Sequence, residues 1–172
     1  MAEKREMIHI EPVLESVLRY CLDDAKKRME EGEAIVPFSA LAVGETLFME
    51  EHPADDPSES FASARKTVAG ARGAQAYGFC YDGFIEVDTA LETNVKRDCL
   101  IAEGGTPGAD YGHAIGLPYR VESDGTIKFH EEPIYVSKAL NYMVNLTSED
   151  AGGEEDGLNI ETFTGAAESA DG

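Results

Sequence analysis

Five side chains that commonly bind cations lie close together in the first third of the chain. They are Glu50, Glu51, His52, Asp55 and Asp56. Carboxylate oxygens and an imidazole nitrogen can together hold a divalent cation, so His52, Asp55 and Asp56 are candidate metal ligands. The sequence also offers a structural role, because Asp56, Pro57 and Glu59 have the spacing of a helix N-terminus. An acidic loop in an acidic protein is usually solvated, so we expect no bound metal here.

Asp110 and His113 are the polar pair best suited to acid–base chemistry, and they belong to the glycine-rich segment 104–113. An aspartate that orients a nearby histidine is the beginning of an acid–base unit, so both are candidate catalytic residues. The same segment lacks the features of a phosphate-binding loop, because it has neither a Gly-Lys-Ser/Thr sequence nor the GxGxxG pattern. No predicted helix follows it to hold an anion. We therefore expect an ordinary connection between two strands.

The three cysteines do not have the pattern of a disulfide framework or a zinc site. Cys21, Cys80 and Cys99 are odd in number and widely spaced, and no CxxC occurs. Cys21 falls on the apolar face of a predicted helix and the other two fall in predicted strands, so we expect small buried side chains. Cys80 or Cys99 placed beside His113 would form a nucleophile–base pair, but this requires a strand order that the sequence does not fix.

The charge balance disfavours several kinds of partner. The chain of 172 residues has 34 Asp and Glu against 14 Lys and Arg, a formal net charge of −20 and a pI near 4.4. A field of this sign repels phosphate backbones and anionic lipid, which argues against binding to nucleic acid or to a membrane surface. No stretch is apolar enough to span a membrane, and the N-terminal residues have no apolar signal core. We therefore expect a cytoplasmic protein.

Three helices are predicted as part of the framework that positions the candidate residues. Apolar side chains recur every three or four positions over 10–31, with Pro12 in the first turn and Gly32 at the C-terminal end. A second helix is expected over 57–72, directly after its N-cap. A third, short helix is expected to start at Ser137. The first two would each cover part of a sheet.

Two short strands are predicted between the first two helices. Residues 34–41 and 46–49 are apolar and flank a turn at Gly44. Pro37 cannot donate a ladder hydrogen bond, so the first of these strands is expected at a sheet edge or a bulge.

The second half of the chain contains the remaining strands. Residues 76–87 can form either one long strand with a glycine bulge or a hairpin on Asp82-Gly83, and we favour the long strand. Residues 98–102 are the best candidate for a central strand. Residues 113–130 have the pattern of a hairpin that turns at Asp124-Gly125.

Residues 147–172 differ in composition from the rest of the chain. They hold eight Asp and Glu and neither Lys nor Arg, which leaves 26 acidic and 14 basic residues, or −12, for residues 1–146. This segment has too little apolar surface to offset the entropy lost on ordering. The sequence therefore predicts one domain over 1–146 and a disordered acidic tail over 147–172.

The order of the predicted elements, with the phrases IVPFSALAVGE, AYGFCYDGF, RDCLIAE and IGLPYR, resembles an uncharacterised family of small bacterial and archaeal α+β domains. The resemblance spans residues 10–135. It implies the fold, and the family has no known activity that could be assigned to residues here.

These observations predict an α+β fold in which an antiparallel, or mixed, sheet of five or six strands is covered by two helices in the order α-β-β-α-β-β-β-β. The favoured function is a non-enzymatic soluble interaction protein without a cofactor, whose partner is a basic protein or a second copy of the chain. The alternative is a small hydrolase that uses His113 with Asp110 and either Cys80 or Cys99. A third interpretation is that the acidity is an adaptation to a salt-rich cytoplasm.

Overall fold

Two helices and seven strands make up the part of the chain that the computed structural model describes, residues 9–146. In chain order they are α2 (Pro12–Glu30), β1 (Phe38–Val43), β2 (Thr46–Glu51), α3 (Pro57–Ala69), β3 (Ala76–Val87), β4 (Val95–Gly105), β5 (Gly112–Val121), β6 (Ile127–Phe129) and β7 (Ile134–Ala139). The predicted disordered tail, 147–172, lies outside the described residues.

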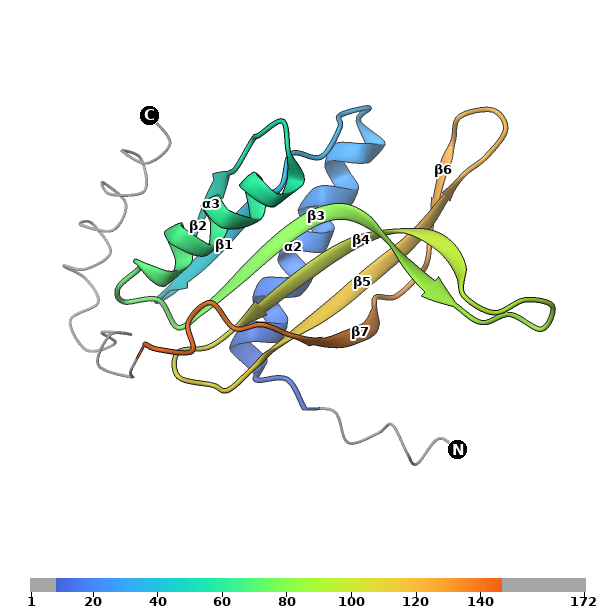
Figure 1. Cartoon of the computed structure of the whole chain (residues 1–172). Helices are drawn as coiled ribbons and strands as arrows, with labels where there is room; N and C mark the ends of the chain where they lie inside the picture. The colour runs from blue at the N-terminus through green and yellow to red at the C-terminus, as the bar shows by residue number, and fades with distance from the viewer. Residues whose placement is uncertain (1–8, 147–172) are drawn as a thin grey trace.

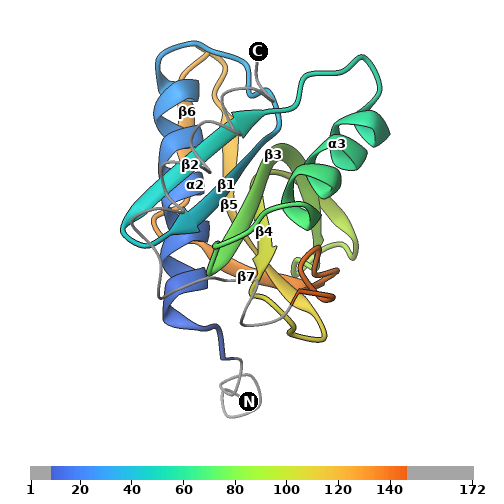
Figure 2. The same ribbon diagram turned by 90° about the vertical axis from the view of Figure 1, so that its left-hand side faces the viewer.

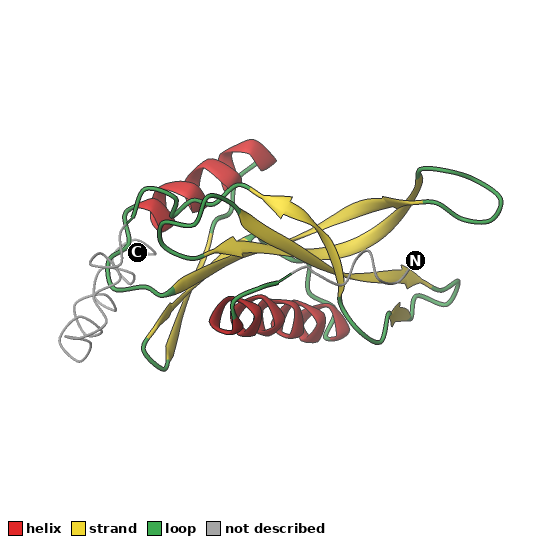
Figure 3. Ribbon diagram, turned by 90° about the horizontal axis from the view of Figure 1, so that it is seen from below, coloured by secondary structure: helices red, strands yellow, loops and turns green. Residues whose placement is uncertain are grey.

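All seven strands join one antiparallel sheet in the order β2-β1-β3-β4-β5, and β5 pairs further with both β6 and β7. The long β3–β4 hairpin reaches beyond both helices (Figure 1). The helices cover opposite faces of the sheet, α2 on one side and α3 on the other (Figure 3). The predicted α+β class with two helices and an antiparallel sheet is confirmed, and the sheet has seven strands instead of the expected five or six.

The helix α2 begins and ends where its sequence predicts. Pro12 occupies the first helical position, where a missing N–H costs no hydrogen bond. Gly32 follows the C-terminal end with a φ of +88°, a conformation that glycine adopts without steric cost. The Gly32 N–H donates to the carbonyl of Met29 at 3.0 Å, and the Glu33 N–H donates to Arg28 at 3.0 Å. This pair of bonds is the Schellman motif, which satisfies carbonyls that the helix leaves unpaired.

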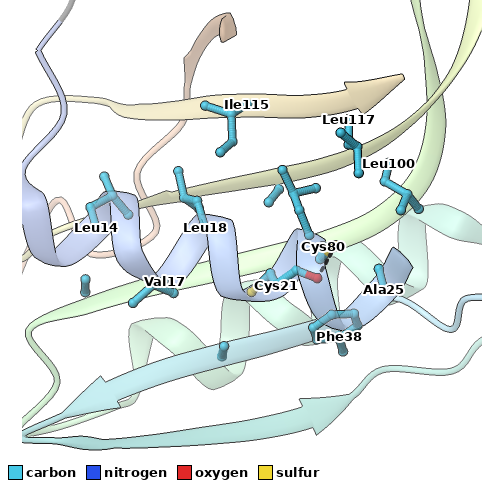
Figure 4. Close-up of a cluster of buried hydrophobic side chains, with 14 of the residues drawn as sticks. Leu14, Val17, Leu18, Cys21, Ala25, Phe38, Cys80, Leu100, Ile115 and Leu117 are labelled. Carbon is cyan, nitrogen blue, oxygen red and sulfur yellow. Dashed lines mark hydrogen bonds between the residues drawn. The ribbon is translucent and has the colours of Figure 1, made fainter. Parts of the chain in front are cut away.

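The main core lies between α2 and the sheet. It is composed of Leu14, Val17, Leu18, Cys21, Leu22 and Ala25 of α2 and of Phe38, Ala40, Ala42, Ala76, Cys80, Leu100, Ala102, Ile115 and Leu117 of the strands (Figure 4). Gly78 of β3 allows the close approach of the helix. A Cβ atom at this position would lie 3.0 Å from Val17 Cγ1 and 3.1 Å from Cys21 Sγ, so a larger residue would push α2 away from the sheet.

A smaller core lies on the opposite face, beneath α3. It contains Leu41, Val43, Val68, Ala71, Ala74, Tyr77 and Met143. The predicted N-cap Asp56 accepts a hydrogen bond from the Ser58 N–H at 3.0 Å, and Gly70 ends the helix. The sequence predicts that Phe61, Ala64, Val68 and Ala71 face inward; the last three are buried, and Phe61 is half-buried.

Two predictions for individual strands need correction. Pro37 lies just before β1, and β1 pairs with both β2 and β3, so the expected edge position or bulge is wrong. The Pro37 carbonyl accepts a hydrogen bond from the His52 N–H at 2.8 Å, and the His52 carbonyl, which lacks a donor at residue 37, accepts one from the Ser60 hydroxyl at 2.6 Å. The long strand expected over 76–87 is confirmed as β3. Its register with β4 is continuous through Gly83, so the expected bulge is not formed.

The short helix expected from Ser137 is also wrong. Ile134–Ala139 is the strand β7, and it takes the outer position beside β5. The apolar residues Met143, Val144 and Leu146, whose spacing suggested a helix, follow this strand in two tight turns. Asn141 fixes the turns, since its Nδ2 donates to the carbonyls of Thr106 and Ala109 at 2.8 Å each.

Leu18→Asp should unfold the domain. Leu18 is fully buried in the middle of the α2 face that covers the sheet. A carboxylate at this position must be buried without a partner or must move the helix, at a cost of several kcal/mol, a large part of the stability of an ordinary domain. Urea denaturation followed by circular dichroism measures the loss. Tyr20→Asp is the matched control, because Tyr20 is 50% exposed on the same helix. Equal stability of the two variants would contradict the assignment of this face.

Candidate functional site

Asp110 and His113 line the same pocket, which lies where the β4–β5 connection meets the start of α2. The other lining residues are His9, Glu11, Leu14, Gly105, Thr106, Ala109 and Tyr111. His113 Nδ1 lies 2.8 Å from the hydroxyl oxygen of Tyr135 on β7, so this hydrogen bond orients the imidazole ring. The structure therefore brings the predicted pair to one place and adds a tyrosine that the sequence did not indicate.

The surroundings of His113 favour its neutral form. Partial burial lowers its pKa below 6.5, and the positive charge of Lys138 and the ring of His9 lower it further. A neutral imidazole can accept a proton, which is the property that general-base chemistry requires. Because the unfolded chain binds this proton more tightly, the contribution of His113 to folding rises with pH up to about 6.5 and is lost below the folded-state pKa.

Neither candidate cysteine lines this pocket. Cys80 lies under α2, where its thiol donates to the Cys21 carbonyl at 3.7 Å (Figure 4). The register places Cys80 opposite Ala102 and Ala102 opposite Ile115, so Cys80 is two strands, or about 10 Å, from the strand that carries His113.

Cys99 belongs to a separate cluster with Ile101 and Ala114, on the sheet face opposite α2. Burial raises the pKa of Cys99 to about 12, and burial also raises the pKa of Cys80 well above its usual value. These thiols stay protonated near neutral pH, whereas the thiolate is the reactive form. The expectation that all three cysteines are buried is confirmed.

The candidate metal ligand His52 is buried and is held by serines. Its Nε2 lies 2.8 Å from Ser39 Oγ, and its Nδ1 lies 2.9 Å from Ser63 Oγ. The Ser60 hydroxyl donates to the His52 carbonyl at 2.6 Å. Ser60 and Ser63 belong to α3 and Ser39 belongs to β1, so this network joins the helix to the sheet.

The two aspartates of the same candidate set do not join His52 at a common centre. Asp56 caps α3, and Asp55 is exposed. Within residues 9–146, no group of three or more His, Cys, Asp or Glu side chains is arranged to hold a metal ion. Sequence reasoning singled out His52 but missed the serines. The available signal was Ser39, a polar residue within the apolar run Val36–Val43.

A second pocket lies beside this network, at the C-terminal end of β2. Its lining residues are Arg28, Phe38, Met49, Glu50, Glu51, His52, Pro53 and Ser63. The Arg28 guanidinium lies 2.8 Å from an Asp24 carboxylate oxygen and 3.1 Å from Glu51, and it also stands over the Phe38 ring. The carboxylates of Glu50 and Glu51 therefore reach this pocket from β2, and Glu51 is paired with Arg28 of α2.

Lys138→Met should raise the pKa of His113 toward 6.5, because it removes a positive charge that disfavours the imidazolium. The methionine keeps an apolar side chain of similar length against the Tyr111 ring, over which the Lys138 amine lies at 4.2 Å. The measurement is an NMR titration of the His113 ring. Lys128→Met on β6 removes an equal charge elsewhere and is the control. Equal His113 pKa values in both variants would contradict the assigned cause.

Ser39→Ala should destabilise the fold by about 1–3 kcal/mol, because it removes the hydroxyl that lies against buried His52 Nε2. Urea denaturation of the full chain measures the change. Ser58→Ala, in the exposed first turn of α3, is expected to change stability by less than about 0.5 kcal/mol. The structural role of the network fails if Ser39→Ala is no more damaging than this control.

Comparison with known proteins adds no assignment. The chain matches no protein-family model, no curated protein and no solved structure. No helix within residues 9–146 is both long enough and apolar enough to cross a membrane. A functional proposal therefore has to rest on the charges, pockets and strand edges of this chain itself.

Proposed function

We propose that this chain is a soluble, non-enzymatic interaction protein that binds a basic protein. One observation carries the proposal: the negative charge is concentrated at one side of the fold. Residues 29–64 hold nine Asp and Glu and neither Lys nor Arg. They are Glu30, Glu31, Glu33, Glu45, Glu50, Glu51, Asp55, Asp56 and Glu59. We call these nine residues the acidic side.

The acidic side lies on neighbouring elements of the fold, and Arg28 of α2 pairs with one of its members, Glu51, at 3.1 Å. It comprises the end of α2, the β1–β2 hairpin and the start of α3, and Figure 2 brings this part of the fold toward the viewer. Most of its carboxylates are exposed. Exposed charges of one sign speed association with an oppositely charged partner, and salt weakens this effect because charges are screened beyond about 10 Å at 0.1 M.

A second copy of the chain is a poorer partner for this surface, because it would bring two acidic sides together. A homodimer would have to use another surface. We further propose that the protein is cytoplasmic, takes no cofactor, and does not bind nucleic acid or membranes, because its field of −20 repels both phosphate backbones and anionic lipid.

The second candidate function is a small hydrolase at the pocket of Asp110 and His113. The observation that favours it is their common position in one pocket with a neutral, oriented imidazole. Such an enzyme would hydrolyse a panel of activated esters, and His113→Ala would abolish the activity. A binding protein would show neither effect.

The main proposal is tested by capture from a lysate of the parent cell on the immobilised full chain, at low and at moderate salt. We expect a specific basic protein whose recovery falls as salt rises. Glu45→Gln with Glu50→Gln should reduce recovery several-fold. Glu131→Gln with Glu132→Gln removes the same charge far from the acidic side and should leave recovery nearly unchanged.

Two results would contradict the proposal. Equal loss in the two paired variants would mean that only the net charge matters. Recovery of no specific protein, with a melting temperature that climbs steeply with salt, would favour adaptation of the whole surface to salt instead.

A further inference from the structure

We infer that the basic partner docks by adding an extended strand to the free edge of β2. The inference rests on the proposed function and names its docking site. Among the described residues, β2 pairs only with β1, so its other edge has no strand beside it. An edge strand of this kind presents a row of unpaired backbone donors and acceptors, which can bind an incoming strand.

The register identifies which residues of β2 present these groups. In an antiparallel pair, alternate residues exchange hydrogen bonds with the neighbouring strand, and the residues between them direct N–H and C=O outward. The His52 N–H donates to the Pro37 carbonyl, so positions 46, 48 and 50 bond to β1. Leu47, Met49 and Glu51 therefore point their backbone groups toward the open edge.

The side chains along the edge would also contribute to strand binding. Leu47 and Met49 are half-buried and pack against the main core on the α2 face. Apolar side chains of an added strand would extend this core on the same face, because alternate residues of a strand share one face. Glu50 and Glu51 line the pocket at the end of the edge, where a Lys or Arg side chain of the added strand would meet the Glu50 carboxylate beside the existing pair of Arg28 and Glu51.

Charge selects a basic strand and disfavours a second copy of β2. Antiparallel pairing of two copies about the centre of the strand would bring Glu51 of each close to Glu45 of the other, and like charges at this range repel. The outer strand β7 at the opposite side of the sheet carries Lys138 and no acidic residue. A basic strand is therefore attracted to β2 and repelled from β7.

The test uses a ten-residue peptide of alternating lysine and valine with blocked ends, and a matched peptide in which glutamate replaces lysine. Backbone hydrogen exchange of the full chain is followed by NMR. Without peptide, the amides of Phe48 and Glu50 should be protected and those of Leu47, Met49 and Glu51 should exchange rapidly. The lysine peptide should slow exchange at Leu47, Met49 and Glu51 at least tenfold, and the glutamate peptide should have no effect.

Met49→Pro provides an independent test, because it removes an outward N–H and leaves the bonds between β1 and β2 in place. Its dissociation constant for the lysine peptide should rise at least tenfold, whereas Met49→Leu should stay within about twofold of the unchanged chain. Circular dichroism checks that each variant is folded. If Met49→Pro does not fold, the docking site is tested by the exchange pattern of the unchanged chain alone.

The outcomes separate the docking site from the proposed function. Binding of the lysine peptide with protection at other amides, or no binding at all, overturns the docking site. Protection at β2 by a second copy of the chain, without peptide, also overturns it. Failure to capture any basic protein from the lysate overturns the proposed function, whatever the peptide does.

Discussion

The packing of α2 against the sheet is the constraint on which the rest of the structure depends. One helix buries its apolar face on four strands at once, and Gly78 sets how closely it approaches. Both pockets take residues from this helix. The pocket of Asp110 and His113 includes Glu11 and Leu14 near its N-terminus, and the pocket beside β2 includes Arg28 near its C-terminus. Any displacement of α2 would therefore change both candidate sites together.

On the sheet face that α3 covers, polar contacts contribute more to the packing than they do beneath α2. His52 is buried between β1 and α3, and a buried imidazole is costly unless its nitrogens find partners. Ser39 of β1 and Ser63 of α3 supply those partners, and Ser60 of α3 donates to the His52 carbonyl. Since α3 has a small apolar face, these hydrogen bonds help to specify where it sits. The residue that looked most like a metal ligand thus has a structural role in this fold.

Much of the fold could be predicted from local patterns, because those patterns report local physical preferences. Pro12 and Gly32 mark helix ends through backbone geometry, and Asp56 marks one through its side-chain hydrogen bond with the Ser58 N–H. Strand order is different, since it depends on contacts between distant residues. The assignment of 137–146 failed for this reason: the apolar spacing suits a helix, but pairing of β7 with β5 and the bonds of Asn141 to the β4–β5 connection prevail. The Ser39–His52–Ser63 network could not be predicted for the same reason, because its members come together only when β1, the end of β2 and α3 are in contact.

The proposed docking site on β2 could be predicted only in part. Its negative charge can be read from the sequence, but the position of β2 at an edge of the sheet cannot. Carboxylates beside a strand edge that no other described strand covers have two consequences. They prevent the strand from pairing with its own copies, which is how natural sheets avoid aggregation, and they favour a strand of opposite charge. Protection against self-association needs only like charge anywhere along the edge. Strand docking also needs the outward backbone groups of Leu47, Met49 and Glu51 to remain accessible and the adjoining apolar side chains to be incompletely buried. The second requirement separates a docking strand from a merely protected one. Among the described residues, β2 pairs with β1 alone and its side chains Leu47 and Met49 are half-buried, as the proposed docking requires.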